Sequence, residues 1–297
     1  MAAEAMPDEL TAGSARFVTL NLWGENGPWQ ERLDLAAAEL ARLAPDVVAL
    51  QEVRDVPGRV PNQAATLAGA RGWSHRFAPT TAWGGGHEGL AVISRFPIGA
   101  HEFRVLPHST ETEGRGVLSV RLDGAAGGVW VHTAHLSYRL NEGVKREEQV
   151  AVLDAVVAAH DDGQGTPQLL MGDFNAGPEH DEIRWLVGQH TIGGRRVAYQ
   201  DAWAVAGDGT PGLTWARAND YTASMHWLRQ DRRLDYIFVT PARRDRRGTI
   251  HQARLALDRP GKTATGERLF ASDHYAVVAD VQLAAPATTT PARPGLG

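Results

Sequence analysis

Short apolar runs separated by polar, glycine-containing loops dominate the chain between residues 16 and 283. Runs rich in Val, Leu, Ile and aromatic residues predict strands over residues 16–21, 46–51, 89–95, 116–121, 129–135, 168–172, 234–240 and 275–283. Apolar residues at helical spacing predict helices over 30–43 and 145–159, and a weaker pattern predicts a third over 179–187. The pattern therefore indicates many strands and few helices.

The strand runs are apolar at successive positions, as in residues 47–50 and 169–171, which is typical of strands that are buried on both faces. A doubly wound sheet would need a helix after nearly every strand, and the stretch from 89 to 135 predicts none. We therefore expect an α/β protein in which two sheets pack face to face and carry helices on their outer sides.

The organisation along the chain predicts one domain. There is no internal repeat and no central linker, and 297 residues are enough to bury one large core. We expect the domain to span residues 15–283. Residues 1–14 and the Pro/Thr/Ala-rich tail at 284–297 are expected to be disordered.

Composition narrows the function classes. The chain has 43% hydrophobic and 22% charged residues, a net charge of -5 and no cysteine, so disulfides, thiolate metal sites and cysteine nucleophiles are excluded. No run approaches the roughly 20 apolar residues of a membrane span, and the acidic start does not resemble a signal peptide. We expect a cytoplasmic protein. Its mild acidity argues against a protein that coats nucleic acid, although a nuclease with a local basic groove stays possible.

The candidate chemistry lies in polar residues at the ends of the predicted strands. A charged group directly after an apolar strand is costly to bury unless it is paired or bound to a metal. The chain places such residues at Asn21, Glu52, His135, Asp173, Asn175, Asp235, Asp273 and His274. So many strand ends with polar residues indicate a functional site.

The residue types favour a particular chemistry. The oxygens of Glu52, Asp173 and Asp273 are hard donors, which suit Mg²⁺ or Mn²⁺. Asp235 is a candidate to orient the imidazole of His274. Acids, histidines and a metal without an activated Ser or Cys indicate direct attack of water on a phosphoester. His132 and His135 are rejected as a metal pair, because residues three apart on a strand point to opposite faces.

A resemblance follows from these residues taken in order. The chain resembles the endonuclease/exonuclease/phosphatase superfamily at Asn21, Leu50-Gln51-Glu52, Thr133-Ala134-His135-Leu136, Gly172-Asp173-Phe174-Asn175, Arg233-Leu234-Asp235-Tyr236 and Ser272-Asp273-His274. The resemblance covers residues 16–283. It implies a four-layer α/β sandwich of two mostly antiparallel sheets flanked by helices, and metal-dependent cleavage of phosphoesters.

The resemblance also implies a role for each motif residue. Glu52 resembles the principal metal ligand, and Asn21 and Asp273 complete or support the metal site. The cofactor implied is Mg²⁺ or Mn²⁺.

The remaining motif residues resemble the catalytic groups. His274 resembles the catalytic imidazole, polarised by Asp235, and Asp173 resembles the residue that positions or deprotonates the attacking water. Asn175 and His135 resemble the donors that hold the phosphoryl oxygens. Whether His274 or Asp173 is the general base stays open at this point.

Other residues are candidate contacts to the substrate. Arg115 either reaches a substrate phosphate or forms a surface ion pair, and Trp203, Trp215 and Asn219 are candidate substrate contacts. A small or lipid-like phosphoester, cleaved by a phosphodiesterase or phosphatase, is favoured by the acidic charge. A DNA or RNA nuclease is the alternative, and a non-catalytic binding module is remote because every motif position is intact.

Overall fold

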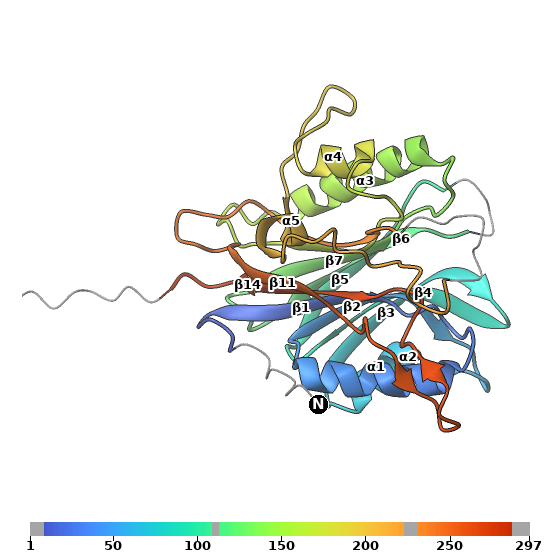
Figure 1. Ribbon diagram of the computed structural model, residues 1–297. Helices are drawn as coiled ribbons and strands as arrows, with labels where there is room; N and C mark the ends of the chain where they lie inside the picture. Colours follow the sequence, from blue (N-terminus) through green and yellow to red (C-terminus); the bar gives the residue numbers. More distant parts are fainter. Residues whose placement is uncertain (1–8, 109–112, 223–230, 287–297) are drawn as a thin grey trace, which may run out of the picture.

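Two six-stranded sheets stack face to face in the computed structural model, which describes residues 9–108, 113–222 and 231–286 (Figure 1). The first sheet contains, in spatial order, β11 (Ile250–Ala256), β14 (Ala276–Gln282), β1 (Ser14–Asn21), β2 (Val47–Asp55), β4 (Gly86–Ser94) and β3 (Ser74–Trp83). The second contains β5 (Ile98–Val105), β6 (Gly116–Leu122), β7 (Val129–His135), β8 (Leu169–Asp173), β10 (Asp235–Val239) and β9 (Gln200–Asp201). A small hairpin pairs β12 (Gly261–Lys262) with β13 (Arg268–Leu269).

Helices cover the outer faces of both sheets. The first sheet carries α1 (Trp29–Leu43) and α2 (Gln63–Gly69), and the second carries α3 (Gly143–Ala159) and α4 (Asp181–Leu186) (Figure 1). A short helix, α5 (Ala202–Ala206), packs beside β10 and β11. The predicted sandwich with two sheets and outer helices is confirmed.

Each strand contributes to two cores, which explains its apolar sequence. In β1, Phe17 packs into the layer between the sheets, whereas Val18 packs under α1 and α2. In β8, Met171 points into the layer between the sheets and Leu170 points toward α3. Successive residues of a strand face opposite sides of its sheet, so both alternations must be apolar here.

The strand directions bring distant segments to one end of the sandwich. The only parallel pairs among the described strands are β1 with β2, joined through α1, and β7 with β8, joined through α3. The carboxyl ends of each pair therefore lie together, and the two pairs meet at one end of the sandwich, where Asn21 at the end of β1 donates to Asp173 at the end of β8. β10 and β14 run antiparallel to β8 and β1, so they begin at that end. This topology gathers the polar residues that end or precede these strands.

The sequence located the buried elements better than the exposed ones. The two main helices begin one or two residues before their predicted starts, and α4 is shorter than the predicted 179–187. β3 and β5 were not predicted, because many of their residues are exposed or half-buried. Most of the predicted disordered ends lie outside the described residues, and no described helix is both long and apolar enough to span a membrane.

Candidate active site

A cavity of about 760 Å³ opens at the end of the sandwich where these strand ends meet. Of the eight predicted catalytic and metal residues, six line it: Glu52, His135, Asp173, Asn175, Asp273 and His274. The other two lie directly behind them. Asn21 donates to lining carboxylates, and Asp235 accepts a hydrogen bond from the ring of His274. The sequence therefore identified residues that the fold brings together from six strands or strand-flanking loops.

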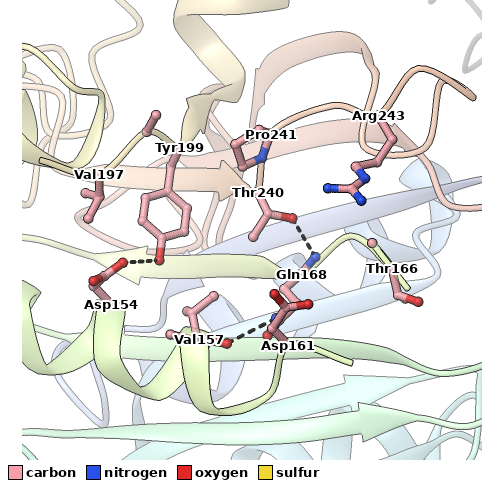
Figure 2. Close-up of a pocket in the computed structure, with 13 residues that line it drawn as sticks. Asp154, Val157, Asp161, Thr166, Gln168, Val197, Tyr199, Thr240, Pro241 and Arg243 are labelled. Atoms are coloured by element: carbon pink, nitrogen blue, oxygen red, sulfur yellow. Dashed lines mark hydrogen bonds between the residues drawn. The ribbon is translucent and has the colours of Figure 1, made fainter. Parts of the chain in front are cut away.

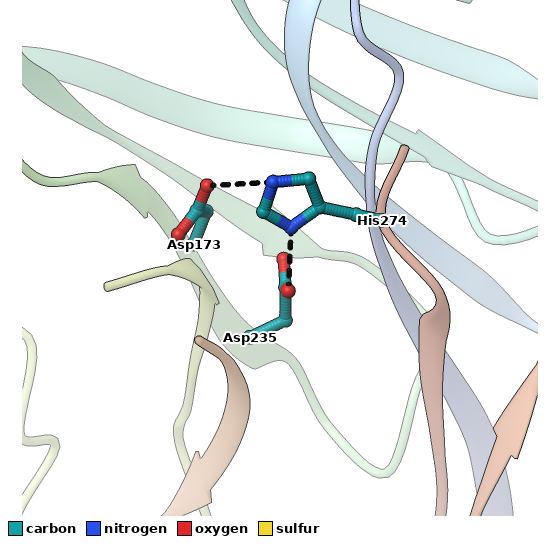
Figure 3. Close-up of side chains that lie close together, drawn as sticks. All are labelled: Asp173, Asp235 and His274. Carbon is teal, nitrogen blue, oxygen red and sulfur yellow. Dashed lines mark hydrogen bonds and ion pairs between the residues drawn. The ribbon is translucent and has the colours of Figure 1, made fainter. Parts of the chain in front are cut away.

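His274 lies between two carboxylates (Figure 3). Its Nδ1 is 2.8 Å from Oδ2 of Asp235, and its Nε2 is 3.7 Å from Oδ2 of Asp173. All three side chains are buried, and one ligand atom from each lies within 4.8 Å of the others, so the group could hold a metal ion. The hydrogen bond from Nδ1 to Asp235 fixes the ring and leaves Nε2 directed at Asp173.

Asp173 is placed by a close approach of β8 to β7. Gly172 has a φ of 143°, and a Cβ there would come within 1.9 Å of the Ala134 carbonyl oxygen, so only glycine fits. The register then sets Asp173 opposite both His135 and Asp235. Oδ2 of Asp173 is 3.4 Å from Nε2 of His135.

Glu52 reaches the cavity because β2 is irregular at this point. The β2–β4 register shifts between Leu50 and Val53, and Glu52 has a left-handed φ of 52°. A bulge of this kind redirects one side chain out of the regular alternation, at a conformational cost of about 1–3 kcal/mol. Asn175 is also left-handed, with a φ of 51°. Backbone strain therefore coincides with two predicted site residues.

Glu52 and Asp273 form an acidic pair that suits a hard cation. The amide of Asn21 donates to Oε1 of Glu52 and to Oδ2 of Asp173, each at 3.0 Å, and so holds two carboxylates in place. Asp273 accepts a hydrogen bond from Ser272 at 3.2 Å. Within the described ranges, neither Glu52 nor Asp273 has a basic side chain at ion-pair distance. Asp273 is buried and Glu52 is half-buried, and carboxylates so placed without such a partner are the expected arrangement at a metal site.

The crowding of charges shifts several pKa values. Burial and the negative charge of Glu52 raise the pKa of Asp273 to about 6, although His274 opposes the shift. Burial and the charge of Asp235 raise the pKa of Asp173 to about 7. Burial alone would lower the pKa of His274, but the charges of Asp235, Asp173 and Asp273 raise it well above its ordinary value. Burial, with the charges of Arg115 and His274, lowers the pKa of His135.

The buried guanidinium of Arg32, in α1, joins the loop that follows Asn21 to the segment that precedes Asp273. Its N–H groups donate to the backbone carbonyls of Leu22, Trp23, Gly24, Asn26 and Ala271 at 2.8–3.3 Å. Its positive charge also faces Asp273 and Glu52. Arg32 therefore connects the loop after β1 with the segment before β14.

The predicted substrate contacts divide into two groups. Arg115 and Trp215 line the cavity. Trp203 does not, because it packs into the core between the sheets and donates from Nε1 to the Thr210 carbonyl at 2.8 Å. Asn219 is fully buried and donates to the Ser272 carbonyl at 2.8 Å, so it supports the loop before Asp273. The structure corrects the predicted substrate contact of Trp203 and Asn219, since neither side chain reaches the cavity.

Several cavity residues were missed by the sequence reasoning. Arg54 and Glu88 face each other on β2 and β4, and Tyr138 and Arg232 come from loops. The position of Arg54 two residues after Glu52 on the same strand was a usable signal. The loop residues carried no such signal, because nothing in their sequence fixes where the loops lie.

A second cavity, of about 340 Å³, lies at the opposite end of β8 (Figure 2). Its buried polar groups are satisfied internally. Tyr199 donates to Asp154 at 2.9 Å, and Gln168 donates to the Val157 carbonyl at 3.1 Å. This cavity therefore has no buried group that requires a ligand.

Comparison with known proteins identifies the family. The model of the Endonuclease/Exonuclease/phosphatase family matches residues 18–274, which includes every motif residue described above. The chain belongs to this family. The endonuclease/exonuclease/phosphatase family is one of metal-dependent phosphoester hydrolases, and the carboxylate–imidazole cluster of this chain could bind such a metal.

The chain is also similar to a curated sequence and to solved structures, and the structures share its fold. The uncharacterised protein YbhP of Escherichia coli (strain K12) is 30% identical over 181 residues, covering 57% of this chain and 70% of YbhP. A truncated Caenorhabditis elegans TDP2 is 20% identical with a TM-score of 0.69, covering 92% of this chain and 99% of that one. The human Nocturnin catalytic domain, solved with a bound sulfate anion, is 20% identical with a TM-score of 0.67, covering 90% of this chain and 93% of that one.

Proposed function

We propose that this protein is a Mg²⁺- or Mn²⁺-dependent hydrolase that cleaves a small or lipid-like phosphoester by direct attack of water. The observation that carries the proposal is the meeting of the acidic pair Glu52 and Asp273 with the buried Asp235–His274–Asp173 group at one cavity. An acidic cation site beside an oriented imidazole suits metal-assisted hydrolysis.

The acidic side of the cavity would hold the metal. Glu52 and Asp273 supply hard oxygen donors, and Asn21 supports Glu52 through its hydrogen bond. A divalent cation bound there would polarise the phosphoryl group and neutralise part of its charge. Asn21 also restrains Asp173, so it couples the metal-binding side of the cavity to the catalytic side.

The catalytic side would move the proton of the attacking water. Asp235 holds the ring of His274 at Nδ1, so Nε2 faces Asp173 and the cavity. The Asp173–His274 pair would take up the proton from water and return it to the leaving oxygen. His135 and Asn175 lie beside Asp173. The side-chain amide of Asn175 donates one N–H to the Leu136 carbonyl at 3.0 Å, and its second N–H, together with that of His135, would donate to the phosphoryl oxygens as negative charge develops.

The charge of the cavity favours a compact substrate over a long nucleic acid. Its lining contains Glu52, Glu88, Glu113, Asp173 and Asp273, and most of its arginines form ion pairs with glutamates. Tight binding of a polyanion requires several free cations along a groove. A nuclease of the same family is the second candidate, because Arg115 and Arg139 lie near the exposed ring of Tyr138, on which a base could stack.

Metal dependence tests the proposal directly. We expect EDTA to abolish hydrolysis of bis-p-nitrophenyl phosphate and either Mg²⁺ or Mn²⁺ to restore it, measured by release of p-nitrophenolate. Glu52→Ala and His274→Ala should each lower kcat by orders of magnitude while the far-ultraviolet circular dichroism stays that of the wild type. Hydrolysis that persists in EDTA, or near-wild-type rates in both variants, would refute the assignment. Cleavage of plasmid DNA that falls steeply with salt would favour the nuclease.

A further inference from the structure

The arginines that line the catalytic cavity differ in their partners. Three of them form ion pairs with glutamates that also line it: Arg54 with Glu88 at 2.7 Å, and Arg115 and Arg139 with Glu113 at 2.9 Å and 2.7 Å. Arg232 is different, since no carboxylate within the described ranges lies at ion-pair distance from it. It is the cavity arginine whose charge is left for a ligand.

Within the described part of the chain, the contacts that hold Arg232 in place do not include a carboxylate, so they do not neutralise its charge. Its backbone forms a two-way bridge with Trp215, with N–O distances of 2.9 Å and 2.8 Å, and its guanidinium carbon lies 4.8 Å from the centre of the Trp215 ring. Trp215 itself is buried. The next residue, Arg233, makes two hydrogen bonds to Asp201 and anchors the start of β10. The side chain of Arg232 is therefore stacked on a fixed surface.

Two features indicate what Arg232 faces. Its Nε is buried and makes no hydrogen bond, which is costly for a charged donor unless a ligand supplies the acceptor. Its guanidinium is also close enough to Asp173 for the carboxylate charge to act on it. A phosphate next to Asp173 would complete the hydrogen bonding of this guanidinium, since an arginine fork matches phosphate geometry.

We propose that Arg232 recognises the phosphate anion of the substrate, and that the substrate carries a single phosphate group with an apolar or aromatic organic part. This inference rests on the proposed function. One arginine without a carboxylate partner can bind one phosphate anion. The organic part would lie at the mouth of the cavity, where the side chains of Trp83, Tyr138 and Leu140 are about half exposed, at 51%, 52% and 52%.

Kinetics of an Arg232→Gln variant test the recognition of phosphate. With bis-p-nitrophenyl phosphate and Mn²⁺, we expect KM to rise about ten- to hundredfold while kcat changes little, the pattern of a lost binding contact. Arg232→Lys should recover only part of the loss, because it restores the charge without the fork. Arg244→Gln, in the exposed loop that follows β10 at the end of that strand away from the cavity, is the matched control and should leave KM unchanged.

Two further measurements separate the possible causes. Calorimetry should give the same Mn²⁺ affinity for Arg232→Gln as for the wild type, whereas inorganic phosphate, titrated in Mg²⁺, should bind the variant at least tenfold more weakly. An unchanged KM and phosphate affinity, or a loss of Mn²⁺ affinity, would overturn the assignment. If the wild type hydrolyses nothing, the proposed function fails, but phosphate binding that depends on Arg232 would still support the recognition site.

The single-phosphate part of the inference has its own test. A ten-nucleotide DNA strand should inhibit hydrolysis of bis-p-nitrophenyl phosphate no better than a single-phosphate diester does, and the inhibition should depend weakly on NaCl. Tight inhibition by the strand that weakens steeply with salt would show several phosphate contacts and would contradict this substrate class.

Discussion

Single residues at this site act through the partners that hold them. His274 is useful for proton transfer because Asp235 fixes its Nδ1 at 2.8 Å. Asp173 lies opposite His135 because Gly172, which has no Cβ, lets β8 approach β7 closely. Removing a partner should therefore impair the site while leaving the fold intact.

The substitution Asp235→Asn, which replaces one carboxylate oxygen by an amide nitrogen, tests whether Asp235 orients His274. An amide in place of the carboxylate keeps the size of the side chain but removes the charge that holds the Nδ1–H of His274. We expect kcat to fall by about 10²–10⁴-fold, the usual contribution of a positioned acid–base group, with Mn²⁺ affinity nearly unchanged. Retention of more than half of the wild-type kcat would mean that Asp235 does not orient His274.

The sequence predicted residues whose position follows from a strand end, and it failed where position depends on tertiary packing. Glu52, Asp173 and His274 directly follow or precede apolar runs, so topology alone brings them together. Trp203 was predicted at the substrate because it lies near the motif loops, and Asn219 because its loop resembles one found in bacterial members of the family. Their burial depends on neighbours far along the chain, such as Ser272 for Asn219, which local sequence does not specify.

Whole elements were predicted according to how deeply they are buried. β1, β2, β7 and β8 are almost entirely buried, and each was recognised from its apolar run. β11 was missed because only three of its seven residues are buried, at every third position (Ile250, Ala253 and Ala256), which matches neither a strand buried on both faces nor a regular alternation. The bulge in β2 was also beyond prediction, since its sequence is that of an uninterrupted strand.

Within the second sheet, β7 contains a buried histidine that acts on stability and lies outside the catalytic cavity. His132 packs beneath α3, with Nδ1 2.8 Å from the Ser119 hydroxyl and Nε2 3.0 Å from Oε1 of Gln168. His135, on the opposite face of the same strand, lines the catalytic cavity. This arrangement agrees with the rejection of the two histidines as a metal pair.

The burial of His132 predicts a loss of stability in acid. Burial lowers its pKa from 6.5 to about 4. His132 is therefore protonated near pH 6.5 in the unfolded chain but only near pH 4 in the folded chain. The contribution of neutral His132 to the free energy of unfolding is complete above pH 6.5 and is lost as the pH falls from 6.5 to about 4. We expect His132 to account for a decrease of about 2 kcal/mol in the free energy of unfolding between pH 7 and pH 5.

Urea unfolding at pH 7 and at pH 5 measures this contribution of His132 to the free energy of unfolding. The wild type contains other groups that titrate in the same range, so the comparison is with His132→Asn. Whatever its stability at pH 7, the variant should lose about 2 kcal/mol less than the wild type on going to pH 5. Equal losses in the two proteins would show that His132 is not the group responsible.

At the scale of the whole molecule, the fold concentrates negative charge at one end of the sandwich. Carboxylates from both sheets line one cavity, and burial together with neighbouring carboxylates raises the pKa of Glu88 to about 7, that of Asp173 to about 7 and that of Asp273 to about 6. Neighbouring carboxylates therefore repel one another at this end, as Glu52 does Asp273 and Asp235 does Asp173, while the apolar layer between the sheets holds the rest of the sandwich together.

A divalent cation should relieve this repulsion and so stabilise the entire fold. At a hundred times its dissociation constant, an ion that binds only the folded state adds about 2.7 kcal/mol, which corresponds to a rise in Tm of several degrees for a domain of this size. Thermal unfolding in Mn²⁺ and in EDTA, at equal ionic strength, measures the shift without any substrate. Glu52→Gln should abolish most of it, because the variant removes the charge of a proposed ligand and keeps its size. A shift of the same size in Glu52→Gln would place the cation elsewhere, and no shift in the wild type would mean that the acidic end of the sandwich does not bind the ion.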